Sequence, residues 1–370
     1  MSSRTAAFAT APRLVVKIGS SLLVEGGAIR ETWLASVVAD IAARRAAGQQ
    51  VVVVSSGAIA LGARRLGLAK GGRGSLDDAQ AAAAVGQIAL AAAWSAAFAA
   101  HGIAAAQILL TLGDLEGRRR YLNVAATLNR LLALGAVPIL NENDSVATQE
   151  IRFGDNDRLA ARSSQAAGAG GVILLSDIDG LYTADPALPH ATLIPTVARI
   201  DDVAHMADAR SASGLGTGGM VAKVAAARIA VQAGIPLAVV DGRPDHPLAR
   251  FAATGHGTVF IAESGTSARK AWLAGRLTVA GRVTIDAGAA TALGAGKSLL
   301  AAGIVAVEGD FARGDAIDII HGATLIARGL SAYDAPDARA IAGVRSDAQA
   351  AILGYAPRTA VVHRDQMVIV

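Results

Sequence analysis

Short apolar runs alternate with long alanine-rich stretches over the first two-thirds of the chain, and this alternation restricts the fold more than any other feature. The runs are rich in β-branched residues and lie at Leu14–Ile18, Val51–Val54, Ala104–Leu110, Val137–Leu140, Val172–Leu175 and Leu237–Val240. The stretches between them predict helices at Thr32–Ala47, Ala79–Ala100, Tyr121–Leu134, Arg158–Ala167 and Val221–Ala233. Strands that are apolar on both faces and separated by helices are typical of a parallel sheet covered on both sides. The pattern predicts an α/β domain with a mainly parallel sheet over residues 1–261.

The rest of the chain follows a different pattern. Residues 262–275 contain Glu, Ser, Gly, Thr, Arg and Lys and predict a linker. Glycine-punctuated strands are then predicted at Leu277–Asp286, Gly303–Glu308, Ala316–Ile320 and Leu325–Arg328, a short helix at Ala335–Ala342, and closing strands at Ala360–His363 and Met367–Val370. Short strands at this spacing indicate a small, mainly β domain over residues 276–370.

Composition excludes several classes of protein. Hydrophobic residues make up 53% and charged residues 17%, which is enough apolar material for a large core and argues against disorder. The chain has no cysteine, so disulfides, thiolate metal sites and cysteine nucleophiles are excluded. The uncharged stretch Ala79–Ala100 is long enough to cross a membrane, but it is mainly alanine and includes Gly86, Gln87 and Ser95. We therefore expect a buried or half-buried helix there, and a cytoplasmic protein that does not associate with membranes.

A polar cluster follows the predicted strand at Val137–Leu140. Asn141, Glu142, Asn143 and Asp144 end the strand abruptly, and Asp155, Asn156 and Asp157 then lead into a predicted helix. Parallel α/β sheets bind their ligands where strands end, so the cluster can hold an amine-bearing substrate or organise cations around phosphates. The alternative is an ordinary turn followed by a helix N-cap.

Two further motifs each combine a lysine with glycine. Lys17 lies near the end of an apolar strand, where a buried ammonium is costly unless it meets an anion, and Gly19 allows close backbone approach. Residues 213–223 place four glycines before Lys223 and the start of a helix, a loop whose N–H groups can wrap phosphates. The alternatives are an edge-strand lysine that reaches water and a plain surface loop.

Two other predicted strands end in small polar residues. Ser55, Ser56 and Gly57 follow one strand and begin a helix, an arrangement whose N–H groups suit a carboxylate or phosphate, although ordinary caps look the same. Ser176 and Asp177 follow another, and Asp177 can bind a ribose or a base edge.

These residues favour phosphoryl transfer. That reaction needs positioning and charge neutralisation more than covalent catalysis, and two lysines with a glycine-rich loop supply both. None of the seven histidines falls in a motif, so no general base is evident. A carboxylate acceptor needs none, because its pKa near 4.3 leaves it ionised at pH 7.

Together the motifs resemble the amino acid kinase family. The matching segments are V-V-K-I-G-S-S, S-S-G-A-I-A, N-E-N-D-S-V-A-T, G-D-N-D, D-G-L-Y-T-A-D-P and S-G-L-G-T-G-G-M-V-A-K, in the family's order. The tail, with F-A-R-G-D, I-A-R-G-L-S-A-Y and I-L-G-Y, resembles a PUA domain. The resemblance implies the three-layer αβα amino acid kinase fold with a mainly parallel sheet, followed by a small, mainly β PUA-like domain.

The resemblance also implies a function: ATP-dependent phosphorylation of the L-glutamate γ-carboxylate to glutamyl 5-phosphate, the first step of proline biosynthesis. ATP and Mg²⁺ are the implied cofactors, proline is the implied feedback inhibitor, and a homo-oligomer, dimer or tetramer, is implied. Three residues match catalytic positions of the family, namely Lys17, Lys223 and Asp157, and Asp157 would orient the two lysines. Three match glutamate-binding positions, namely Ser56, Asp144 and Asn156. The positions that match ATP-binding residues are Lys17, Ser176, Asp177, Thr217, Gly218, Gly219, Met220 and Lys223. No residue is singled out as a metal ligand.

Two alternatives stay open. Another member of the family could act on acetylglutamate, aspartate, carbamate or UMP, although the acidic cluster suits a free α-amino group. The PUA-like tail raises the possibility of an RNA-binding protein. From Arg276 onward the chain has nine basic and nine acidic residues, so the tail carries no net charge. A neutral domain is poorly suited to bind phosphates, and a nucleic-acid partner is therefore not expected.

Overall fold

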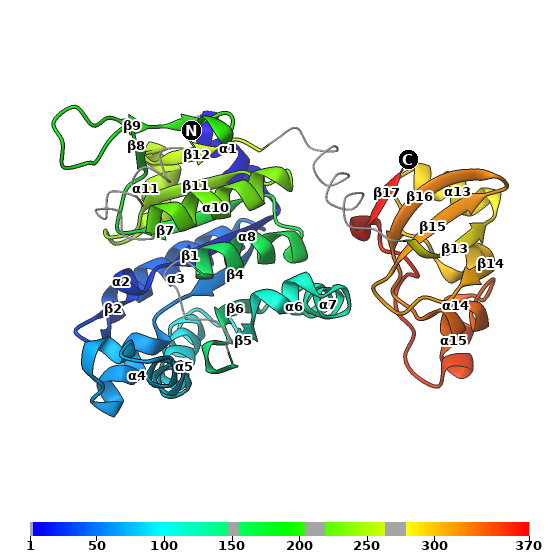
Figure 1. Ribbon diagram of the computed structural model, residues 1–370, viewed down its shortest axis with the longest axis horizontal. Coiled ribbons are helices and arrows are strands. Elements are labelled where there is room, and N and C mark those ends of the chain that lie inside the picture. Colours follow the sequence, from blue (N-terminus) through cyan, green and yellow to red (C-terminus); the bar gives the residue numbers. More distant parts are fainter. Residues whose placement is uncertain (1–2, 147–154, 204–218, 263–278, 370) are drawn as a thin grey trace. The chain divides into compact units, whose positions relative to one another are not determined.

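The computed structural model describes residues 3–146, 155–203, 219–262 and 279–369 (Figure 1). Predictions for Thr217, Gly218 and all of the linker except residue 262 lie outside the described residues. The chain divides into two compact units. The first comprises Met1–Glu116 and Val124–Gly265, and the second comprises Gly117–Asn123 and Thr266–Val370.

The first unit is built on an eight-stranded sheet. Its strands lie in the order β10 (Thr196–Val197), β12 (Thr258–Phe260), β11 (Leu237–Asp241), β7 (Val172–Ser176), β1 (Arg13–Ile18), β4 (Gln50–Ser55), β6 (Val137–Glu142) and β5 (Ala105–Leu110). All neighbouring strands are parallel except β11 and β12. The prediction of a mainly parallel sheet is confirmed, and β10 and β12 are short strands that the sequence pattern did not indicate.

Helices cover both faces of this sheet, as Figure 1 shows. One face carries α1 (Ser3–Thr10), α3 (Glu31–Ala46), α5 (Leu76–Ala99) and α11 (Pro247–Thr254), and the other carries α8 (Asp155–Ala167) and α10 (Gly219–Gln232). The remaining elements are α2 (Ser20–Leu23), β2 (Val24–Glu25), β3 (Ala28–Ile29), α4 (Ala58–Leu66), η1 (Ala69–Gly72), α6 (Leu112–Glu116), α7 (Arg118–Ala133), η2 (Asp144–Val146), β8 (Leu181–Tyr182) and β9 (Leu193–Ile194). The three-layer αβα arrangement is therefore confirmed.

Alternation along β1 decides where its one lysine points. Leu14, Val16 and Ile18 pack into the core shared with α3 and α5. Because successive side chains of a strand point to opposite faces, Lys17 lies on the face covered by α8 and α10.

Helix α5 is long enough and apolar enough, by length and composition alone, to cross a membrane. Its residues Leu90, Trp94 and Phe98 are nevertheless buried in the core of the first unit. Trp94 also donates a hydrogen bond from Nε1 to Ser55 Oγ of β4, at 2.9 Å. The helix is thus an integral part of the layer that covers the sheet.

Two glycines bring α4 and α5 unusually close. A Cβ on Gly62 would lie 1.8 Å from the carbonyl oxygen of Ala82, and one on Gly86 would lie 1.8 Å from that of Ala58. No side chain fits at either place. Since α4 begins directly after Gly57, the close packing of α4 on α5 fixes the position of Ser55 and Ser56, which precede Gly57.

The second unit is a small β domain. Its sheet has the order β14 (Ile304–Gly309), β13 (Val279–Ile285), β15 (Ala316–His321), β16 (Thr324–Leu330) and β17 (Met367–Ile369). The short elements around it are α13 (Ala287–Gly294), η3 (Ala301–Gly303), α14 (Ala335–Ala340), α15 (Ser346–Leu353) and η4 (Arg364–Gln366). The strand predicted at Ala360–His363 is wrong, because Val362 forms only an isolated bridge with Leu299. Helices α13 and α15 were not predicted.

We expect Gly86→Ala to destabilise the first unit by about 1–3 kcal/mol, the usual cost of overpacking a well-packed core. Urea unfolding followed by the fluorescence of Trp33 and Trp94, both buried in this unit, measures the effect. Ser95→Ala, at an exposed position of the same helix, is the control and should change little. Equal stability of Gly86→Ala and the control would contradict the close crossing.

Candidate active site

The carboxyl ends of five parallel strands define one edge of the sheet. From β11 to β6 this edge carries Asp241, Ser176, Gly19, Ser55–Ser56 and Asn141–Glu142. The sequence motifs, which lie far apart along the chain, therefore meet here in the order of the strands. Open α/β sheets bind their ligands at this edge.

A buried ion triplet occupies the middle of the edge. Lys17 Nζ of β1 lies 2.6 Å from Asp157 Oδ1, and Lys223 Nζ of α10 donates to Asp157 Oδ2 at 3.3 Å. Asp157 is the third residue of α8 and is 1% exposed, and the lysines are 7% and 8% exposed. We call Lys17, Asp157 and Lys223 the ion triplet. One carboxylate between two ammonium groups leaves an excess positive charge, which favours an anionic ligand.

The pKa of Asp157 reflects this pairing. Burial by itself raises the pKa, but the charges and hydrogen bonds of Lys17 and Lys223 outweigh it and hold the pKa below its usual value. Asp157 is therefore ionised at neutral pH.

On the β4–β6 side of the triplet, three amides and a serine form a connected network. Asn156 Nδ2 of α8 donates to Ser56 Oγ at 3.0 Å and to Asn141 Oδ1 at 3.1 Å. The backbone N–H of Glu142 donates to Asn141 Oδ1 at 2.9 Å and to Asn156 Oδ1 at 3.3 Å. Asn141 is 2% exposed and donates to Gln87 Oε1 of α5 at 2.8 Å. The predicted pair Ser56 and Asn156 is thus brought together.

A pocket of about 300 Å³ adjoins this network. Its polar lining comes from Asp144, Asn143, Glu142, Ser145, Gln87 and Gln107, and its apolar lining comes from α4, α5 and β5. Asp144 begins η2, two residues after Glu142, whose backbone N–H donates to Asn156 Oδ1. Amide, hydroxyl and carboxylate groups around a small cavity suit a polar ligand that carries both an ammonium and a carboxylate.

The sequence indicated no role for Gln87, and it indicated Asn141 only as part of the polar cluster after Leu140. Asn141 stands inside a motif, but its burial and its link between Asn156 and Gln87 are visible only in the fold. Gln87 is the one amide side chain between Ala81 and Phe98 in an alanine-rich helix. That isolation in an apolar stretch was the signal that could have found it.

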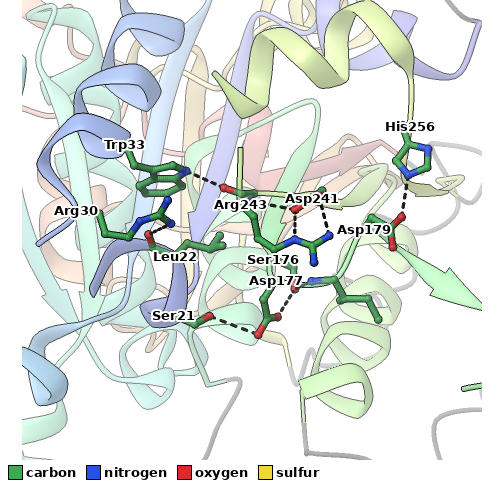
Figure 2. Close-up of polar contacts among 12 residues, drawn as sticks. Ser21, Leu22, Arg30, Trp33, Ser176, Asp177, Asp179, Asp241, Arg243 and His256 are labelled. Atoms are coloured by element: carbon green, nitrogen blue, oxygen red, sulfur yellow. Dashed lines mark hydrogen bonds and ion pairs between the residues drawn. The ribbon is translucent and has the colours of Figure 1, made fainter. Parts of the chain in front are cut away.

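On the β7 side, Asp177 is held between two hydroxyls. Ser176 Oγ donates to Asp177 Oδ1 at 3.2 Å, and Ser21 Oγ of α2 donates to Asp177 Oδ2 at 3.5 Å (Figure 2). Gly219 and Met220 begin α10, and Lys223 Nζ also donates to the Gly219 carbonyl at 3.5 Å. The first turn of α10 is thus tied to the ion triplet.

Two family models and several full-length relatives match this chain. The model of the amino acid kinase family matches residues 12–241, and that of the PUA domain matches residues 281–353. A relative in Sphingopyxis alaskensis is 66% identical, covering 98% of both chains. Relatives in Novosphingobium aromaticivorans and Zymomonas mobilis are 62% and 58% identical, covering 97% of this chain and 96% and 91% of theirs. All three carry the name glutamate 5-kinase.

The family model and the named full-length relatives define the chain as a phosphotransferase. The chain belongs to the amino acid kinase family and ends in a PUA domain.

We expect Asp157→Asn to lower the free energy of unfolding at pH 7 by about 3–5 kcal/mol, because it leaves two buried ammonium groups without a counter-charge. The folded pKa of Asp157 lies below its unfolded value, so its stabilisation is present above about pH 4 and is lost as the pH falls through the folded pKa. Urea unfolding from pH 7 to pH 3 should show the two curves converging on acidification.

The control is Asp201→Asn, which breaks the exposed pair between Asp201 and Arg228 at 3.6 Å. A surface pair contributes less than about 1 kcal/mol. If Asp157→Asn costs no more than Asp201→Asn at pH 7, the triplet does not stabilise the fold.

Proposed function

We propose that this protein transfers the γ-phosphoryl group of ATP to the γ-carboxylate of L-glutamate, forming glutamyl 5-phosphate, the first step of proline biosynthesis. One observation carries the proposal: the ion triplet lies between a polar pocket on the β6 side and the Ser176–Asp177 loop on the β7 side. The printed names of the full-length relatives support it. They do not favour acetylglutamate, aspartate, carbamate or UMP as the acceptor.

Lys17 and Lys223 are the catalytic cations in this proposal. A γ-carboxylate oxygen attacks the γ-phosphorus, a new O–P bond forms, and the bond to the bridging oxygen breaks so that ADP leaves. Both reactants are anionic, and the two ammonium groups offset their repulsion and the charge that develops during transfer. Asp157 contacts both lysines and keeps them at a fixed separation.

The acceptor requires no general base. Glutamate's γ-carboxyl has a pKa near 4.3 and is ionised at neutral pH. No proton is transferred in the step, which fits the absence of histidine from the described part of this site.

Glutamate is proposed to bind through Ser56, Asn156 and Asp144. Asn156 is positioned by Ser56 and Asn141, which accept from its Nδ2, and its Oδ1 can accept a second hydrogen bond besides the one from the Glu142 N–H, which suits the substrate's α-ammonium group. Asp144 lines the pocket, and its carboxylate suits the substrate's α-ammonium group.

ATP is proposed to lie along the other half of the edge, through Lys17, Ser176, Asp177, Gly219, Met220 and Lys223. Thr217 and Gly218 complete this set from the family motif. Among the described residues no three acidic or histidine side chains gather around a possible metal position. Mg²⁺ characteristically binds through nucleotide phosphates with few protein ligands, and when bound it would neutralise phosphate charge.

Further proposals follow from the family. Residues 1–261 form the kinase domain, 262–275 the linker and 276–370 the PUA domain. Proline, which shares the α-amino and α-carboxylate groups of glutamate, competes for the Asn141–Asp157 region as a feedback inhibitor. The protein works in the cytoplasm as a homo-oligomer, a dimer or tetramer.

The direct test is an assay with ATP, Mg²⁺ and L-glutamate in which hydroxylamine traps the acyl phosphate. We expect glutamate-dependent hydroxamate that decreases competitively with added proline. Aspartate, acetylglutamate, bicarbonate with ammonia, and UMP serve as competing acceptors. Turnover of one of these without glutamate turnover would overturn the proposal.

Substitutions should separate catalysis from binding. Lys17→Ala and Lys223→Ala should lower kcat by several orders of magnitude, because each lysine meets charge that develops in the transition state. Asp144→Ala should mainly raise the glutamate KM, by roughly 10- to 150-fold, the equivalent of a charge-assisted hydrogen bond of about 1.5–3 kcal/mol. Steady-state kinetics with each substrate varied measures both. A near-normal kcat in either lysine variant removes that lysine from the mechanism.

A further inference from the structure

The loop that follows β11 crosses directly over the end of β7. Asp241 is paired with Ser176 across the two parallel strands, and the N–H of Gly242 donates to the Ser176 carbonyl at 2.7 Å. A Cβ on Gly242 would lie 2.4 Å from Leu22 Cδ1 and 2.9 Å from Leu175 Cβ, so only glycine fits at this crossing. Trp33 Nε1 of α3 fixes the loop from the other side by donating to the Gly242 carbonyl at 2.8 Å.

The next residue, Arg243, is oriented by a two-point contact. Its Nε lies 2.8 Å from Asp241 Oδ1 and its Nη2 lies 2.9 Å from Asp241 Oδ2. Its backbone N–H also donates to Asp241 Oδ1, at 2.9 Å. The two contacts of the Arg243 guanidinium group with the Asp241 carboxylate, which we call the fork, fix the plane of that group, as Figure 2 shows. The Arg243 side chain is nevertheless 59% exposed. An oriented plane that is open to solvent is a preformed surface for a flat ligand.

The neighbouring charges are otherwise occupied. Asp179 accepts from Tyr182 Oη at 2.9 Å and pairs with His256 Nε2 at 2.8 Å. Asp177 is held by Ser176 and Ser21. Both aspartates lie close enough that their charges help to raise the pKa of Arg243, although the fork with Asp241 is the larger cause. Asp241 is nevertheless the one carboxylate in direct contact with Arg243 among the described residues.

The order of the strands then relates Arg243 to the ion triplet. Strands β1, β7 and β11 are consecutive in the sheet and carry Lys17, Asp177 and Arg243 at or just beyond their carboxyl ends. Two strand spacings, about 10 Å, separate the first from the last. A nucleotide with its phosphates at the triplet and its ribose at Asp177 would extend its base toward β11.

We propose that Arg243 binds the nucleobase of ATP, with the face of its guanidinium group stacked on the ring and Asp241 holding that face in position. This inference rests on the proposed function. The fork already satisfies one edge of the guanidinium group and offsets its charge, which makes it a poorer partner for phosphate than either triplet lysine. Its planar face is free to stack, an interaction that arginine forms with flat π systems.

The test compares Arg243→Gln with two related variants and a control. Arg243→Gln should raise the ATP KM by roughly 3- to 30-fold, the range expected for a cation–π contact, and leave the glutamate KM unchanged. Arg243→Lys keeps the charge but loses the fork and the plane, so it should behave like Arg243→Gln. Asp241→Asn should show a smaller rise of the same kind. Arg250→Gln, which removes an exposed charge from the following helix α11, should leave the ATP KM unchanged.

Two inhibitors locate the contact on the nucleotide. In Arg243→Gln the inhibition constant of adenosine should rise with the ATP KM, whereas that of inorganic tripolyphosphate should stay the same. An unchanged ATP KM, full rescue by lysine, or a tripolyphosphate constant that rises as much as the adenosine constant would overturn the inference. If the unaltered protein forms no acyl phosphate from glutamate and ATP, the proposed function itself fails, and this outcome is separate from any result with the Arg243 variants.

Discussion

The site depends on one interaction, the contact of a single buried carboxylate with two buried ammonium groups. Each of the three residues comes from a different element: Lys17 from β1, Asp157 from α8 and Lys223 from α10. Isolated buried charges are costly, so each member is tolerable only while the others are in place. The contact therefore joins the sheet to both helices of one face. It also leaves a net positive charge at the point where we propose phosphoryl transfer.

Around this centre the parallel sheet sets the order of the binding regions. The amide network and its pocket lie toward β4 and β6, the Ser176–Asp177 loop lies on β7, and Arg243 follows β11. Glycine permits the close approaches that this order requires. Gly86 lets α5 pack against α4, and Gly242 lets the loop after β11 cross the end of β7. The close packing at these two glycines thus helps to determine where the polar side chains lie.

The sequence predicted the central strands, Lys17 and Lys223 from local signals, whereas the place of Asp157 between the two lysines was implied only by the family resemblance. Doubly apolar β-branched runs indicate buried parallel strands, and a lysine inside such a run indicates an anion partner. The short strands β10 and β12, at and next to one edge of the sheet, carry too few residues for a pattern to form. The sequence did not predict the roles of Gln87 and Arg243 for a different reason. Their roles depend on which strands and helices become neighbours, and no local pattern records that.

The most direct test of the account is a crystal structure of the protein with L-glutamate, Mg²⁺ and a non-hydrolysable ATP analogue. We expect the γ-phosphoryl group within hydrogen-bonding distance, about 3 Å, of both Lys17 Nζ and Lys223 Nζ. We also expect glutamate beside Asn156 and Asp144, and the base beside Arg243. A γ-phosphoryl group that contacts neither lysine, or a nucleotide that runs toward β6 with glutamate on the β11 side, would contradict it.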